Sequence, residues 1–213
     1  EEDLRGSREV LGDRHPETLT SINNLGDLLQ EQGELDGAMV LFEEALRMSR
    51  EVLGDRHPST LSSVSSMAGL LQEQGRLDEA MTLFEEALRV SREVLGDKHK
   101  DTMSAASKMA GLLQDLGRFD EAKLLYEEDL RVSREVLGSH HPETLTSINN
   151  MGKLLQEQGE LDEAMTLFGE ALRVSREVLG DRHKDTLTSI NNTACLLQEQ
   201  GKLDEAKLLF EEA

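Results

Sequence analysis

The sequence predicts an all-α solenoid of helix-turn-helix repeats, because two residue types recur along the whole chain at one fixed spacing. Successive histidines stand 42 residues apart, at His15, His57, His99, His141 and His183. Glycines recur at the same spacing, at Gly33, Gly75, Gly117, Gly159 and Gly201. A period of this length is typical of arrays in which each repeat buries its apolar face against its neighbours. We therefore expect one repeat array and no single central core.

The first half of each repeat predicts a helix, called helix A here. From Pro16 to Gln32 the apolar residues fall mostly at steps of three and four, which places them on one helical face: Leu19, Ile22, Leu25, Leu28 and Leu29. Proline suits the first helical position, and Glu17 brings a carboxylate to the positive end of the helix dipole. Gly33 supplies the conformational freedom to end the helix.

The second half predicts helix B, from about Leu35 to Leu53, ended by Gly54. Its apolar stripe consists of Leu35, Ala38, Phe42, Ala45, Leu46, Val52 and Leu53. Ala38, Ala45 and Gly26 of helix A are small, so we expect the two helix backbones to approach closely there.

These helices divide residues 1–213 into a single array. A partial helix B and its joint occupy 1–14, followed by repeats at 15–56, 57–98, 99–140, 141–182 and 183–213, the last with a truncated helix B. Solenoids normally carry polar capping repeats, and neither end shows one. We therefore expect head-to-tail self-association, in which Leu203–Ala213 of one molecule meets Glu1–Leu11 of the next.

Composition excludes several function classes. The formal net charge is −20, from 43 acidic and 23 basic residues, and it repels phosphate backbones and anionic membrane surfaces. No apolar run approaches the roughly 18 to 20 residues that span a bilayer. A single cysteine, Cys195, favours a reducing, cytoplasmic location. Phosphate-binding glycine loops, nucleophile elbows and zinc-binding pairs are missing, so we predict no enzymatic activity, cofactor or metal site.

The order of small and large residues resembles the tetratricopeptide repeat (TPR): Leu25, Gly26, Leu29, Gly33, Leu35, Ala38, Phe42 and Ala45. The 42-residue length, the joint Leu53–Pro58 and the segment Ile22–Leu25 are most similar to the long repeats of kinesin light chains. The resemblance implies a right-handed superhelix whose concave groove is lined by the A helices and binds extended peptides or helices.

Carried over position by position, the resemblance assigns the groove to one face of helix A. The candidate peptide-binding residues are Asn23, Asp27, Gln30, Ser65, Gln72, Ser107, Lys108, Gln114, Asn149, Lys153, Gln156, Asn191, Cys195 and Gln198. The least uniform column, from Asp27 to Cys195, either sets specificity or has drifted freely. Because an asparagine amide both donates and accepts, the asparagines either hold a peptide backbone or bridge adjacent A helices.

Groove charge indicates the class of partner. The acidic groove positions are Glu31, Glu73, Asp115, Glu157 and Glu199, and the basic ones are Lys153 and the rim residue Lys108. We therefore predict a protein-interaction scaffold for a neutral or basic extended peptide or helix. The alternative is a structural or assembly module without a dedicated ligand, which the high similarity among repeats favours.

One departure from the pattern bears on packing. Asp3 and Asp129 stand in the column that elsewhere holds Ala45 and its equivalents. Burying an unpaired carboxylate is costly. We expect these aspartates to turn toward solvent or meet a basic group, with a functional acid as the alternative.

Overall fold

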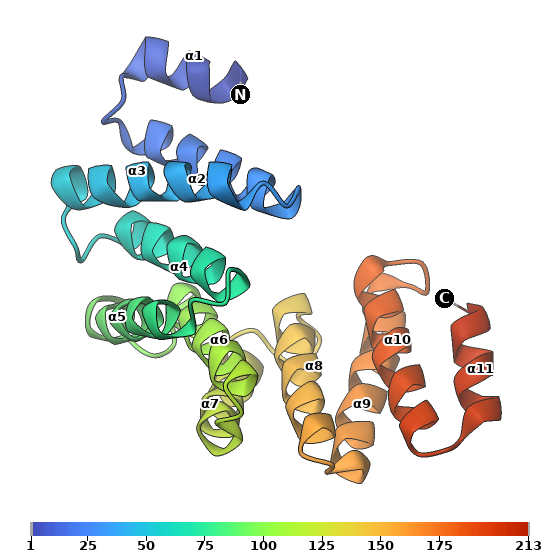
Figure 1. Ribbon diagram of the computed structural model, residues 1–213. Helices are drawn as coiled ribbons and strands as arrows, with labels where there is room; N and C mark the ends of the chain where they lie inside the picture. The colour runs from blue at the N-terminus through green and yellow to red at the C-terminus, as the bar shows by residue number, and fades with distance from the viewer. Residues whose placement is uncertain (1, 213) are drawn as a thin grey trace. The chain divides into compact units, whose positions relative to one another are not determined.

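The computed structural model describes residues 2–212, and their side chains from 4 to 211; the side chain of Asp3 lies outside this range. The described chain is all-α, with eleven helices and no strand (Figure 1). The helices are α1 (Glu2–Leu11), α2 (Pro16–Glu31), α3 (Leu35–Leu53), α4 (Pro58–Glu73), α5 (Leu77–Leu95), α6 (Lys100–Asp115), α7 (Phe119–Val136), α8 (Pro142–Glu157), α9 (Leu161–Leu179), α10 (Lys184–Glu199) and α11 (Leu203–Glu212). The predicted fold class is confirmed, and the predicted ends of helices A and B lie within one residue of those observed.

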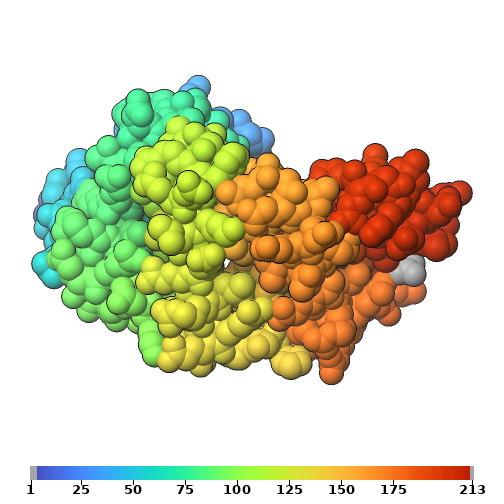
Figure 2. Space-filling view, turned by 90° about the horizontal axis from the view of Figure 1, so that it is seen from below, coloured from blue at the N-terminus to red at the C-terminus, as the bar shows by residue number. Residues whose placement is uncertain are grey.

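The chain forms two compact units, Glu1–Leu112 and Leu113–Ala213, which meet within α6. Unit 1 contains the A helices α2, α4 and most of α6, and unit 2 contains α8 and α10. In each unit, consecutive helices pack as antiparallel neighbours, such as α2 on α3 and α8 on α9. Figure 2 shows the side-chain surface, where the orange and red residues of α9 to α11 adjoin within unit 2. The repeat limits within one array stay a prediction.

The recurring histidine begins helix A. Nδ1 of His15 accepts a hydrogen bond from the backbone N–H of Glu17 (3.2 Å), and His57 accepts one from Ser59 (3.1 Å). The same bond forms at His99, His141 and His183. The histidine column is therefore a column of N-caps.

The glycines end the helices by adopting positive φ. Gly33 has φ +78°, and the N–H of Glu34 donates to the carbonyl of Leu29 at 2.8 Å, which closes a Schellman turn. Gly54 ends helix B with φ +83°, and its carbonyl accepts from Thr60 Oγ1 at 2.8 Å. The glycine and threonine together fix the joint between repeats.

An aromatic residue on helix B forms the centre of each repeat core. Phe42, Phe84 and Phe168 are at most 1% exposed. A Cβ added to Gly26 would lie 2.5 Å from Cε1 of Phe42, and one added to Gly152 would lie equally close to Phe168. The expected close approach of the two helices is confirmed at both glycines.

Two residues that we expected on the apolar faces of helices A and B are exposed. Leu28 is 47% exposed, whereas its equivalents Leu70 and Leu154 are fully buried, because this column packs between successive A helices and α2 is the first A helix of the described chain. Val52 is 40% exposed at the end of helix B. Ser49 is buried in the same helix, although the apolar pattern left it out.

Asp129 on α7 also departs from expectation. It neither turns to solvent nor meets a basic group: it is 5% exposed, and Ser147 Oγ on α8 donates to its Oδ2 at 2.6 Å. Burial raises the pKa of Asp129; the Glu143 and Glu128 carboxylates act in the same direction, and the hydrogen bond from Ser147 opposes them. The carboxyl is therefore a buried acid that a hydroxyl partly compensates.

Candidate functional site

The exposed side of helices α2, α4 and α6, called the A-helix face of unit 1, is crossed by side-chain hydrogen bonds. Asn23 Nδ2 on α2 donates to Ser63 Oγ on α4 at 2.9 Å. One turn further along, Ser66 Oγ on α4 donates to Asp27 Oδ1 at 3.5 Å. These contacts link the A helices of successive repeats at the expected groove positions.

The glutamine column continues this linkage. Gln30 Nε2 on α2 donates to Glu73 Oε2 on α4 at 2.7 Å, and in unit 2 Gln156 Nε2 on α8 donates to Glu199 Oε1 on α10 at 2.6 Å. The amides thus fix the carboxylates of the next A helix, so these acidic groups are ordered on the face.

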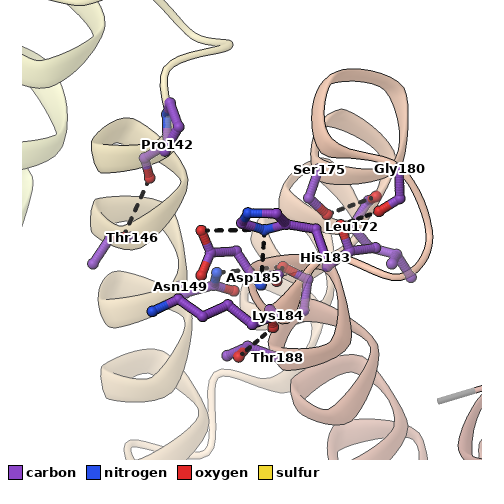
Figure 3. A network of polar contacts seen from close by, with 12 residues as sticks. Pro142, Thr146, Asn149, Leu172, Ser175, Gly180, His183, Lys184, Asp185 and Thr188 are labelled. Carbon is purple, nitrogen blue, oxygen red and sulfur yellow. Dashed lines mark hydrogen bonds and ion pairs between the residues drawn. The ribbon is translucent and has the colours of Figure 1, made fainter.

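The A-helix face of unit 2, formed by α8 and α10, carries bonds at equivalent positions. Asn149 on α8 faces α10 (Figure 3), where its Nδ2 donates to Ser189 Oγ at 3.4 Å and its Oδ1 accepts from Asn192 Nδ2 at 3.2 Å. Asn149 is buried, whereas Asn191 in the same column of α10 is exposed. Asn23 and Asn149 therefore bridge adjacent A helices, which was the structural alternative for the asparagine pairs.

Two charges from different repeats interact on the face of unit 1. Asp27 lies on α2 and Lys108 on α6, with α4 between them. Burial lowers the pKa of Lys108, and the nearby Asp27 carboxylate opposes this shift. Burial raises the pKa of Asp27, and Lys108 and a hydrogen bond from Ser66 oppose that shift. The charges on the first and third A helices therefore influence one another on this face.

The remaining predicted positions lie on the A helices with graded exposure. Lys153, Cys195 and Gln198 of unit 2 are exposed. The half-buried positions are Ser65 and Gln72 on α4 and Ser107 and Gln114 on α6. A binding role for all fourteen residues stays a prediction.

The hydrogen-bond partners on the neighbouring A helix were not predicted from the sequence. Ser63, Ser66 and Ser189 take part in the bonds across the face but were not among the predicted positions. Their signal was available in the sequence, since Ser63 stands 40 residues after Asn23 and Ser189 stands 40 residues after Asn149. An offset of 40 residues thus joins the Asn and Ser columns, whereas Asp27 and Ser66 are 39 residues apart and Gln30 and Glu73 are 43 apart.

The outer side of each unit carries a second set of bonds between B helices. Arg50 on α3 makes a bidentate contact with Glu86 on α5 (2.8 and 2.9 Å), and Arg134 on α7 does the same with Glu170 on α9. Glu44 on α3 accepts a bond from Arg8 of α1, and Arg47 contacts Glu51 on its own helix. Arg47 finds its partner on the next turn, because Glu44 faces the preceding helix.

Metal-binding groups and membrane-spanning helices are both lacking among the described residues. Between residues 2 and 212 no group of three or more His, Cys, Asp or Glu side chains is placed to hold a metal ion. Over the same residues, every helix is too short or too polar to cross a membrane.

Models of a known protein family match this chain along its repeats. Models of the tetratricopeptide repeat match residues 18–59, 59–128, 101–174 and 146–213. None of the curated protein sequences matches the chain.

Several solved structures share the fold. A protein from Podosopora anserina, named for kinesin light chain and for its nearly identical TPR-like repeats, is 27% identical, with a TM-score of 0.76 over 93% of this chain and 94% of that one. BtubC (BKLC) from P. vanneervenii is 22% identical, with a TM-score of 0.78 over 99% and 86%. Rap protein complexed with Competence and Sporulation Factor is 15% identical, with a TM-score of 0.75 over 89% and 51%.

The repeat models together cover nearly the whole chain, and the long histidine-capped repeats are of the kinesin-light-chain-like kind. The TPR fold generally serves as a non-enzymatic scaffold for protein interaction. This chain belongs to the tetratricopeptide repeat family.

Proposed function

We propose that this protein-interaction scaffold binds a neutral or basic extended peptide on its A-helix face. The observation that carries the proposal is the excess of ordered, exposed carboxylates on this face. Asp27, Glu31 and Glu73 are exposed in unit 1, and Glu157 and Glu199 in unit 2. Lys108 and Lys153 are the basic groups at the predicted positions of these faces. A cationic or neutral segment meets this surface without charge repulsion.

The bonds across the face favour binding of an extended chain. Gln30 and Gln156 use their amide donors on Glu73 and Glu199, which holds these side chains in place before a ligand arrives. Groups that are already ordered lose less entropy when a partner binds. The Oε1 of Gln30 and the second oxygen of Glu73 remain as acceptors for the N–H groups of an extended peptide.

Partner chemistry follows from net charge. At −20 the chain repels nucleic acid and anionic membranes, so we expect a protein or peptide partner in a cytoplasmic setting. The solved Rap protein is complexed with Competence and Sporulation Factor, which supports ligand binding by a fold of this kind.

The test is a binding series with synthetic peptides. Fluorescein-labelled nonapeptides of Ser, Asn and Gly, carrying zero to three lysines, are titrated by fluorescence polarisation. We expect affinity to rise with lysine number, and Glu31→Gln and Glu157→Gln each to weaken the three-lysine peptide by roughly 2- to 5-fold, as for an exposed ion pair.

The matched control is Glu127→Gln on α7, an exposed carboxylate on helix B. It should leave binding unchanged. Affinity that ignores lysine number, or an equal loss in the control, contradicts the proposal.

A second candidate function, head-to-tail self-association, is favoured by α11. Its Leu203 and Phe210 are 63% and 43% exposed, whereas the equivalent aromatic residues Phe42 and Phe168 are fully buried. Exposed apolar groups of this kind favour contact with another apolar surface. Light scattering coupled to size exclusion should show a concentration-dependent mass that Phe210→Ser reduces; a constant monomer mass for the parent rejects this candidate.

A further inference from the structure

A cavity of about 270 Å³ opens between α4, α5 and α6 within unit 1. Its walls carry serine hydroxyls from all three helices, and Leu61, Leu95 and Ala105 supply the apolar part of the lining. The serines are Ser59, Ser62, Ser65, Ser91 and Ser104. The cavity is thus polar on its walls and large enough for an amino-acid side chain together with its backbone.

Three substitutions explain why the space is open here. At the equivalent place in unit 2, Asn149 bonds both Ser189 and Asn192 and so links α8 to α10. The same three columns hold Ser65, Ala105 and Lys108 between α4 and α6. A serine and an alanine are too small to meet across the helices, and the lysine is too long to take the place of Asn192.

Ser91 has lost its usual partner and faces the cavity. In the neighbouring repeats the equivalent serines pair with a serine of the next A helix: Ser49 Oγ lies 3.4 Å from Ser63 Oγ, and Ser133 Oγ lies 3.2 Å from Ser147 Oγ. Ala105 stands opposite Ser91, so Ser91 has no hydroxyl across from it on α6. Ser91 lines the cavity instead.

The two ends of the cavity carry opposite charges. Lys108 and Asp101 both lie on α6 and are seven residues apart, so two helical turns, roughly 10 Å, separate them along the axis. Lys108 has no ion pair within 4 Å among residues 2–212, and Asp27 interacts with it only at longer range. Asp101 lies beside the imidazole of His99, with Oδ2 3.7 Å from Nδ1.

We propose that this cavity is a specificity pocket for one acidic residue of an extended peptide, whose carboxylate pairs with Lys108 while the serine hydroxyls bond its backbone. The peptide then runs toward Asp101, where its next groups are amide donors or a cation. About three extended residues cover this length. The inference rests on the proposed function and adds to it one required acidic position in an otherwise neutral or basic segment.

The test compares peptides that differ at one position. Fluorescein-labelled nonapeptides that carry two lysines and a central Glu, Gln or Lys are titrated by fluorescence polarisation. The parent should bind the Glu peptide roughly tenfold more tightly than the Gln peptide, the scale of a charge-assisted hydrogen bond. Lys108→Asn, which restores the residue of the equivalent Asn150, should abolish this preference.

A second variant fills the cavity with residues that the chain uses elsewhere. The double substitution Ser65→Asn and Ala105→Ser reproduces the junction of unit 2 and should weaken both the Glu and the Gln peptide by about tenfold or more. Lys202→Asn, at an exposed lysine of unit 2 outside the predicted binding positions, is the matched control and should leave the Glu preference intact. Thermal melting monitored by circular dichroism checks that every variant is folded.

The outcomes separate the two proposals. If peptides bind but the Glu preference is missing in the parent, or persists in Lys108→Asn and in the filled variant, the pocket is rejected and the binding face stands. If no peptide of either series binds, both are rejected. Loss of the preference in the two unit 1 variants alone supports the pocket.

Discussion

Two junctions between successive A helices, α4 with α6 and α8 with α10, occupy equivalent places in the repeat but differ in their interior. Both follow the same histidine cap and the same glycine turn, so their backbones begin and end alike. The α8 and α10 junction is bridged by the two hydrogen bonds of Asn149, whereas the α4 and α6 junction contains a cavity of about 270 Å³. The joint between repeats therefore fixes the backbone. The size of the side chains at a few equivalent positions then decides whether a junction is filled or open.

The largest loss of unfolding free energy should come from substitutions in the repeat cores. These substitutions test whether the two units differ only at the junctions between A helices. Phe84→Ala in unit 1 and Phe168→Ala in unit 2 each remove a ring that is at most 1% exposed. We expect each to cost about 3–5 kcal/mol of unfolding free energy, measured by urea titration. A much smaller loss for Phe84→Ala would show that the open junction loosens the whole of unit 1.

Opening the closed junction should cost less. Asn149→Ser removes two hydrogen bonds and leaves a space between α8 and α10, so we expect a loss of about 1–3 kcal/mol. Asn191→Ser, at the exposed position of the same column, is the control and should change the stability by less than about 0.5 kcal/mol. Equal losses for the two variants would mean that the asparagine bridge does not close the junction.

The buried acid of unit 2 is a further difference between the units, because unit 1 has Ala45 and Ala87 at the positions equivalent to Asp129. Asp129→Ala should stabilise the protein by about 1–2 kcal/mol at neutral pH, since Ser147 Oγ keeps the carbonyl of Glu143 (3.2 Å) as its acceptor. The folded pKa of Asp129 is raised above 3.8, so its burial destabilises the fold increasingly as pH rises through that folded value.

Urea titrations across this pH range measure the effect. The advantage of Asp129→Ala over the parent should be small below pH 3.8 and largest at neutral pH. Asp129→Asn, which cannot ionise, serves as the control and should lack this pH dependence. An advantage that is constant with pH would show that the carboxyl is not buried in its charged form.

The smallest effect should come from the outer face, where the two units are alike. Arg50→Gln and Arg134→Gln each remove a half-exposed bidentate contact with a glutamate of the next B helix. We expect each to cost about 0.2–1 kcal/mol and the cost to vanish in high salt. Unequal costs in urea titrations would show that the units differ on this face as well.

Much of the fold could be predicted because its signals are local. The histidine caps, the glycine turns and the spacing of Leu19 and Ile22 all act within one helix or its ends. Helix limits and the small residue at Gly26 followed from these features. Gln30 of the predicted face contacts the next repeat, and a binding role for that face stays a prediction.

The bonds across that face could not be predicted, because each joins residues about one period apart. Asn23 pairs with Ser63 and Asn149 with Ser189, and this offset depends on how one helix lies across the next. The same reason applies to Ser91, which stands opposite Ala105, whereas the equivalent Ser49 and Ser133 lie beside serines of the next A helix.

The sequence by itself therefore determined the period, the helix pairs, the caps and the family resemblance, since periodicity and turn chemistry are properties of neighbouring residues. The tertiary structure alone decided that Leu28 is exposed, that Asp129 is buried against Ser147 and that serines line an open cavity in unit 1. Whether a side chain is buried or paired depends on which helices pack together and at what distance. A repeating sequence pattern does not determine this packing at a position where one repeat has a different residue from the others.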